Sequence, residues 1–162
     1  MKIVKIFTIL AALALGACAT GTAANTAPVF VPADKSAIMG SDWYLTEIRS
    51  EGAVTSLNRL KLQAEGNEDT YSLRFDEKNG VFGKAAPNTY RGPCHWGSGS
   101  ALTFGPMALT MVASKKEPPA GLEEHAYFKF LREVKSWGLT AEDRLGLNCE
   151  DESGRVIMVF ER

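Results

Sequence analysis

Three cysteines and two histidines are the residues of this chain best suited to covalent or acid–base chemistry. Cys18 ends the run Leu15-Gly16-Ala17-Cys18, which has the order of the bacterial lipobox: Leu, two small residues, then Cys. Cleavage before such a cysteine leaves it as the first mature residue. Its sulfur and amine then carry acyl chains, and several chains together make a stable membrane anchor. The chemistry predicted for Cys18 is therefore lipidation.

The other candidates for chemistry do not form a catalytic pattern. Cys94 and His95 are sequence neighbours, and neighbouring side chains of a strand point to opposite faces, whereas a catalytic Cys and His must meet in space. His125 has no second histidine four residues on, so the zincin pattern is absent. Residues 97–100 read Gly-Ser-Gly-Ser, but Trp96 stands where a hydrolase elbow needs its first glycine. We predict no catalytic residues, metal ligands or cofactor.

Trp96 belongs to Pro93-Cys94-His95-Trp96-Gly97, a segment with the composition of a loop. An exposed tryptophan there, with His95 beside it, could anchor a partner, because aromatic residues dominate contact hot spots. The simpler interpretation is that Trp96 packs over a sheet edge. His95 and Trp96 are kept as candidate partner-binding residues.

The segment before Cys18 is typical of a signal peptide. Lys2 and Lys5 precede an uncharged apolar run that is shorter than the roughly 20 residues a spanning helix needs. Ala12-Leu13-Ala14 offers an ordinary secretory cleavage site as one alternative, and a retained anchor is another. We predict a lipoprotein signal peptide at residues 1–17. Because residue 19 is Ala and not Asp, the bacterial sorting rule implies the outer membrane, facing the periplasm.

The mature chain is weakly acidic and begins with a segment poor in charge. Removal of residues 1–17 takes two of the 18 basic residues and leaves 19 acidic ones, a formal charge of −3. No basic stripe suited to a phosphate backbone is present, so nucleic acid is not an expected partner. Residues 18–40 are predicted to be a flexible tether, although residues 29–31, Val-Phe-Val, could form an edge strand or contact the domain. The folded domain is expected to span residues 41–162.

Alternating apolar residues predict about seven strands, and one segment predicts a helix. The seven regular strand segments are 42–48, 70–75, 81–82 after a turn at Asn79-Gly80, 101–104, 107–112, 145–147 and 156–160. Residues 57–62 alternate less cleanly and could form a further short strand. The helix follows Pro118-Pro119, carries Tyr127, Phe130, Leu131 and Val134 on one face, and ends near Gly138. The predicted fold class is α+β, a curved antiparallel sheet packed with one main helix.

An ordered series of short segments resembles the META domain of the heat-shock protein HslJ over residues 41–162. The series is Trp43-Tyr44-Leu45, Leu73-Arg74-Phe75, Gly80-Val81-Phe82-Gly83, Asn88-Thr89-Tyr90-Arg91-Gly92, Ala101-Leu102-Thr103-Phe104-Gly105-Pro106-Met107-Ala108, Thr110-Met111-Val112-Ala113, and Glu124 with Tyr127-Phe128 and Leu131. This resemblance implies an envelope or periplasmic protein linked to stress tolerance, with no established catalytic chemistry.

The chain departs from the resembling family in its cysteines. Many members have Gly-Cys-Asn where this chain has Ala86-Pro87-Asn88, and Met-Ala-Cys where it has Val112-Ala113-Ser114. Cys94 and Cys149 are the two cysteines left once Cys18 is acylated, and an oxidising periplasm permits their pairing. We predict a disulfide between Cys94 and Cys149, with two unbridged thiols as the alternative, because sequence cannot place their Cα atoms within about 7 Å.

Two functions follow from these observations. The first is a non-enzymatic lipoprotein anchored to the outer membrane, which supports envelope homeostasis under stress by binding an envelope protein or component. The second is a periplasmic inhibitor or binder of a specific hydrolase, with Gly92 to Ser100 as the inserting element. An enzyme is the least favoured class, because no convergent set of polar residues is evident.

Overall fold

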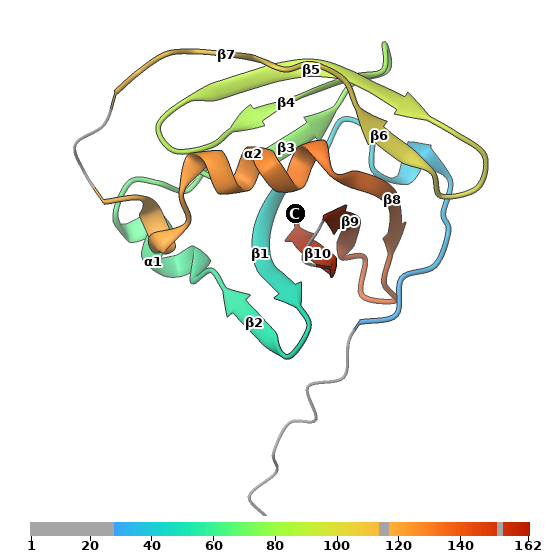
Figure 1. Cartoon of the computed structure of the whole chain (residues 1–162), viewed down its shortest axis with the longest axis horizontal. Coiled ribbons are helices and arrows are strands. Elements are labelled where there is room, and N and C mark those ends of the chain that lie inside the picture. The colour runs from blue at the N-terminus through green and yellow to red at the C-terminus, as the bar shows by residue number, and fades with distance from the viewer. Residues whose placement is uncertain (1–27, 114–116, 152–153) are drawn as a thin grey trace, which may run out of the picture.

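The computed structural model describes residues 28–113, 117–151 and 154–162, and its main feature is an antiparallel sheet (Figure 1). The described strands are β1 (Asp42–Ser50), β2 (Ala53–Ser56), β3 (Ser72–Phe75), β4 (Gly80–Lys84), β5 (Thr89–Trp96), β6 (Leu102–Phe104), β7 (Ala108–Leu109), β8 (Val134–Leu139), β9 (Leu145–Asp151) and β10 (Gly154–Glu161). Eight follow the path β6-β5-β4-β3-β1-β10-β9-β8, while β2 pairs with β1 and β7 with β5. The curved antiparallel sheet was predicted; its ten strands exceed the seven expected.

The sheet curls until its two end strands meet. Ala101, next to β6, forms an antiparallel bridge with Ser136 of β8. The backbone N–H of Trp137 donates to the carbonyl of Ser100 at 2.9 Å. The eight-strand path therefore nearly closes into a barrel, an arrangement that protects strand edges from unwanted pairing.

The main helix, α2 (Glu124–Arg132), lies across the barrel, between the β3–β5 side and the β1, β9 and β10 side (Figure 1). It buries Tyr127, Phe128 and Leu131. The ring of Phe128 packs edge-on against Tyr90, with centroids 5.3 Å apart. The helix is shorter than predicted: it ends at Arg132, and Val134, expected on its apolar face, is the first residue of β8.

Residues 28–40, predicted as part of a tether, pack against the barrel. Val31 and Leu139 exchange two backbone hydrogen bonds of 2.9 and 3.1 Å. The ring of Phe30 lies over Gly146, where an added Cβ would come within 2.3 Å of it. After a 3₁₀ turn, η1 (Lys35–Ala37), Ile38 is fully buried, and its carbonyl accepts the indole N–H of Trp43 at 3.0 Å. The contact with the domain left open for Val-Phe-Val is thus present, and the folded part begins before Ser41.

Two further predictions of local structure were wrong. Residues 57–62 were considered a candidate short strand, but α1 (Arg59–Ala64) begins there, because the side chain of Asn58 accepts the backbone N–H of Lys61 and caps the helix. Residues 89–96 were not expected to be a strand, yet they form β5, which pairs with β4, β6 and β7. A second 3₁₀ turn, η2 (Pro119–Gly121), precedes α2. Within the described ranges, no helix has the length and apolar character required to cross a membrane.

Candidate functional site

Cys94 and Cys149 do not meet in this fold. Cys18 lies outside the described residues. Cys94 of β5 and Cys149 of β9 are 2% and 1% exposed, and no disulfide joins them. On the shorter way round the barrel, β6 and β8 separate β5 from β9, and strands lie about 4.8 Å apart. That separation far exceeds the Cα distance that a disulfide permits. The structure therefore does not form the predicted bridge, and it matches the alternative of two buried thiols.

The buried thiols should be chemically inert in the folded protein. Burial raises the pKa of the Cys94 thiol to about 11, so about 0.1% is thiolate at pH 8. In a full chain carrying Cys18→Ser, we expect a thiol reagent to modify Cys94 and Cys149 slowly, at a rate that for Cys94 rises about tenfold per pH unit between pH 8 and 10. Unfolding in guanidinium chloride without reductant should release both thiols at once. Unfolded protein that still lacked reactive thiols would show the disulfide to be present after all.

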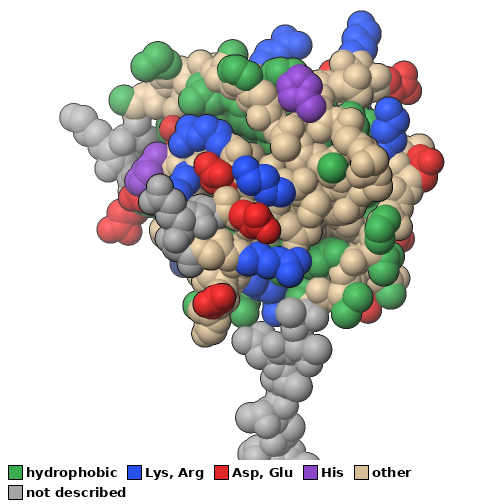
Figure 2. All heavy atoms as spheres, turned by 45° about the vertical axis from the view of Figure 1, so that its right-hand side comes forward, with side chains coloured by type: hydrophobic (Ala, Val, Ile, Leu, Met, Phe, Trp, Pro, Cys, Tyr) green, Lys and Arg blue, Asp and Glu red, His purple; other side chains and the backbone are tan. Residues whose placement is uncertain are grey.

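The two residues proposed to bind a partner have different settings. His95 is exposed on β5, and His125 lies on α2; the two histidine side chains are well apart on the face shown in Figure 2. Trp96 turns inward, with its ring 5.2 Å from Phe75 and 5.8 Å from Trp137. The proposed inserting loop is mostly strand: residues 92–96 belong to β5, and only the turn around residues 97–101 projects as a hairpin to β6. Trp96 therefore packs against the sheet, as the simpler of the two interpretations predicted, and does not offer an exposed anchor.

Charge on the same face is mixed. Figure 2 shows lysine and arginine side chains interspersed with aspartate and glutamate and not gathered into one positive stripe. Such a pattern is unlike the single-sign surface expected for a nucleic-acid backbone.

Asn88, just before β5, is the centre of a hydrogen-bond network that sequence reasoning missed. Its side-chain oxygen accepts from the Thr110 hydroxyl at 2.9 Å and from the backbone N–H of Val112 at 2.7 Å. Its side-chain nitrogen donates to the Val112 carbonyl and to the Glu124 carboxylate. The second carboxylate oxygen of Glu124 accepts the Asn88 backbone N–H at 3.1 Å. This network ties the β7 segment and α2 to the start of β5.

Two buried tyrosines, Tyr90 and Tyr127, form a second polar network inside the barrel. A third, Tyr71, packs its ring on Tyr127 and donates its hydroxyl to the carbonyls of Pro119 and Leu122. The carbonyl of Ser72 accepts the hydroxyls of Tyr90 at 2.8 Å and of Tyr127 at 3.2 Å. Burial raises the pKa of all three tyrosine hydroxyls well above the ordinary value. The hydroxyls therefore stay protonated at neutral pH and act as hydrogen-bond donors. The Ser72 carbonyl can take this position because residue 83 is glycine: a Cβ on Gly83 would lie 2.0 Å from the Ser72 carbonyl oxygen.

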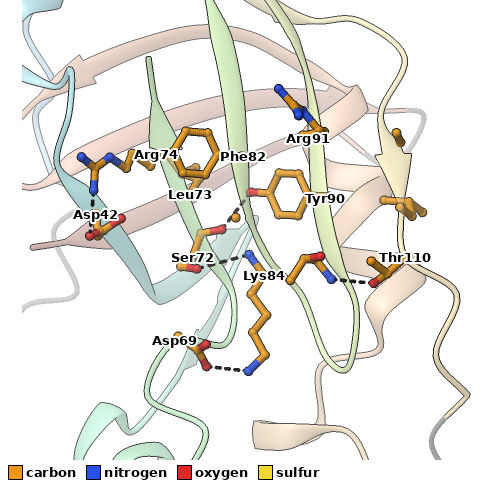
Figure 3. A pocket seen from close by; sticks show the side chains of 14 residues that line it. Asp42, Asp69, Ser72, Leu73, Arg74, Phe82, Lys84, Tyr90, Arg91 and Thr110 are labelled. Atoms are coloured by element: carbon orange, nitrogen blue, oxygen red, sulfur yellow. Dashed lines mark hydrogen bonds and ion pairs between the residues drawn. The ribbon is translucent and has the colours of Figure 1, made fainter.

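The strongest functional candidate is a cleft of about 690 Å³ on the outer face of β3, β4, β5 and β7 (Figure 3). One wall is a row of residues in direct register across five strands: Asp42, Arg74, Phe82, Arg91 and Ala108. Phe82 is 40% exposed and stands between two arginines. The guanidinium of Arg74 lies 6.0 Å from the centre of its ring. This wall combines an exposed aromatic surface with positive charge.

The opposite wall is polar. It comprises Ser72, Lys84, Thr89 and Thr110, with Asp69 at the end of the Lys84 side chain. The ammonium of Lys84 lies 2.7 Å from the Asp69 carboxylate, and the guanidinium of Arg74 lies 3.4 Å from that of Asp42. Arg91 has no ion-pair or hydrogen-bond partner among the described residues. The cleft thus has one uncompensated positive charge beside an aromatic ring.

The cleft lies across the strands and not along one of them. Its floor is formed by the backbone and by Leu73, Gly83 and Tyr90 of successive strands, and the exposed Leu109 lies at its β7 end. With about 4.8 Å between strands, the distance from β1 to β7 is roughly 19 Å. Fold and cleft define a nearly closed antiparallel barrel with one covering helix and an open, mixed-polarity groove on its outer face.

Comparison with known proteins identifies the family. The sequence model of the META domain matches residues 36–162, and the chain belongs to the META domain family. Among solved structures, the chain is similar to a protein from Burkholderia xenovorans whose structure was determined by NMR, with a TM-score of 0.61 and 21% sequence identity over 85% of this chain and 92% of that chain. At that identity the likeness shows the fold alone. No curated protein matches the chain.

Proposed function

We propose that this protein is a non-enzymatic lipoprotein of the outer membrane that supports envelope homeostasis under stress by binding an envelope component. The observation that carries the binding role is the cleft between the Arg74-Phe82-Arg91 wall and the polar wall opposite, because open grooves with a few convergent polar groups are where ligands bind. Membership of the META domain family supports a bacterial envelope location.

The beginning of the described chain lies away from the cleft. Residues 28–31 run beside β8 and β9, and in Figure 1 this segment lies on the side of the barrel opposite β5 and β7. A lipid anchor attached through this segment leaves the cleft uncovered, which supports a role for the cleft in binding periplasmic glycans or soluble proteins.

The hydrolase-inhibitor alternative has weaker support. It needs a protruding loop with an exposed anchor, whereas Trp96 packs on Phe75 and Trp137. No residue of the β5–β6 turn has the large exposed side chain that dominates most protein contacts.

The proposal is tested by complementing a strain that lacks the protein and measuring survival of heat or envelope stress. Cys18→Ser should abolish labelling with palmitate, release the protein from membranes and remove protection. Ala108→Trp, which adds bulk to the exposed cleft wall, should remove protection while leaving labelling intact.

Val54→Trp is the matched control for added bulk, because Val54 is 37% exposed on β2, outside the cleft. It should protect as well as the wild type. Membrane retention of Cys18→Ser would contradict the lipid anchor. Full protection by a stably folded Ala108→Trp variant would contradict a role for the cleft.

A further inference from the structure

We propose that the cleft binds an acidic glycan, a chain of sugar rings that carries carboxylate groups. The inference rests on the proposed binding function and names the ligand class. The first observation behind it is charge. The cleft contains three basic residues, of which Asp42 and Asp69 neutralise Arg74 and Lys84. Arg91 remains to be paired, and a guanidinium holds a carboxylate through two parallel hydrogen bonds.

The second observation is the placement of the aromatic ring. Phe82 is the register neighbour of both Arg74 and Arg91, so its exposed surface lies between the two guanidinium groups. A sugar ring has one apolar face, formed by its C–H groups, which can stack on an aromatic side chain. A ring seated on Phe82 places a carboxylate substituent within reach of Arg91.

The third observation is the polar wall. Ser72, Lys84, Thr89 and Thr110 line the side of the cleft across from the aromatic wall. Ser72 and Thr110 contribute hydroxyl groups there, while the Lys84 ammonium points to Asp69 (Figure 3). The hydroxyl groups on the edge of a sugar ring can hydrogen-bond to these side chains. A hydrocarbon chain in the same place would remove these polar groups from water without offering them hydrogen-bond partners, which is unfavourable.

The direction of the cleft excludes strand addition. A peptide that extends a sheet must lie parallel to its edge strand and form ladder hydrogen bonds with it. The cleft crosses β3, β4 and β5, so a peptide lying along it would cross the strands at a large angle. A linear chain that binds through its rings and substituents needs no such ladder, and roughly 19 Å accommodates several linked sugar rings.

The test compares two tetrasaccharides binding to the purified full-length protein by calorimetry. One alternates N-acetylglucosamine with N-acetylmuramic acid, and the other contains N-acetylglucosamine alone, so the pair differs only in carboxylate-bearing lactyl groups. We expect the acidic chain to bind about tenfold more tightly at low salt, and this preference to shrink as salt is raised. Arg91→Gln should abolish the preference. Arg132→Gln, a matched change on the exposed side of α2, should leave it intact.

Phe82→Ser provides an independent check of ring stacking. It should weaken both glycans about fivefold or more, while keeping the preference for the acidic one. Equal affinity of the wild type for both glycans, or a preference that survives Arg91→Gln, would overturn the proposal. So would binding of acidic peptides or anionic lipid vesicles that depends on Arg91 when neither glycan binds.

The outcome separates this inference from the proposed function. If neither glycan binds but Ala108→Trp abolishes stress survival, the ligand class is wrong and the binding role remains. If Ala108→Trp leaves survival unchanged, the proposed function fails even where the glycan binds.

Discussion

Replacing Gly83 with alanine is expected to lower the free energy of unfolding by about 3 kcal/mol or more, the largest effect we expect from adding a single methyl group. A Cβ at this position would lie 2.0 Å from the carbonyl oxygen of Ser72 and 2.8 Å from its carbon. Both atoms belong to the backbone of β3, so no side-chain rotation can relieve the clash. The two strands must move apart.

The clash also affects hydrogen bonding, because the same Ser72 carbonyl accepts hydrogen bonds from two buried tyrosine hydroxyls. Separation of β3 from β4 would displace the Ser72 oxygen from the hydroxyls of Tyr90 and Tyr127 and leave these buried groups without partners. We therefore expect the melting temperature to fall by about 10 °C, measured by circular dichroism. The floor of the cleft should distort at the same time.

Gly52→Ala, in the turn between β1 and β2, is the control for the loss of a glycine. Gly52 has φ of 72° and nothing within 4 Å of an added Cβ, so alanine there meets only the left-handed backbone penalty of about 1 kcal/mol. A Gly83→Ala variant no less stable than Gly52→Ala would show that β3 and β4 can separate without loss, contrary to the steric argument.

The alternation of apolar residues was sufficient to predict the strands whose pattern is regular. Trp43 and Leu45 of β1, and Leu73 and Phe75 of β3, are buried as their spacing indicated. The strand β5 was missed because Gly92-Pro93 interrupts it. Its inward positions in fact keep a period of two, with Tyr90 and Cys94 buried on either side of Gly92. Glycine is needed at position 92 for close packing and not for a turn, because a Cβ there would approach the Pro106 carbonyl oxygen within 2.9 Å.

The end of α2 could not be predicted from the spacing of apolar residues, because the helical spacing continues from α2 into the first residue of β8. Val134 lies seven residues after Tyr127, so it fits the helical stripe, yet it is also the first inward residue of β8. Gly138, interpreted as a helix stop, lies within β8, where a Cβ would approach the Val31 carbonyl within 2.9 Å. Both misreadings arise from contacts between segments distant in sequence, which local patterns do not contain.

The cleft was beyond sequence reasoning for the same reason. Its aromatic wall takes one residue from each of five strands between Asp42 and Ala108, and only the register of all four strand pairs places them in one row. Arg74, Phe82 and Arg91 each look like ordinary outward residues of an alternating strand. All three residues lie in segments that resemble the META domain, but that resemblance implies no binding role for them.

Asn88→Ala is expected to destabilise the protein by about 3 kcal/mol and to weaken the cleft as well. Asn88 is 6% exposed, and its side chain makes four hydrogen bonds, to Thr110, Val112 and Glu124. Alanine would leave these donors and acceptors without protein partners, and solvent can reach only some of them. Denaturant unfolding should show a lower midpoint with little change in slope.

Glu124 of α2, which hydrogen-bonds to Asn88, allows the energetic coupling between these two residues to be tested. Glu124→Gln keeps the size of the side chain but turns one carboxylate oxygen into an amide that cannot accept from Asn88, so a smaller loss of about 1 kcal/mol is expected. Because both changes break the same contacts, the double variant should be less destabilised than the sum of the two single variants. Additive losses would show that Asn88 acts through Thr110 and Val112 alone. Since those two residues continue from β7, the wall that carries Arg91 and Ala108 would then depend on the Asn88 side chain without help from the helix.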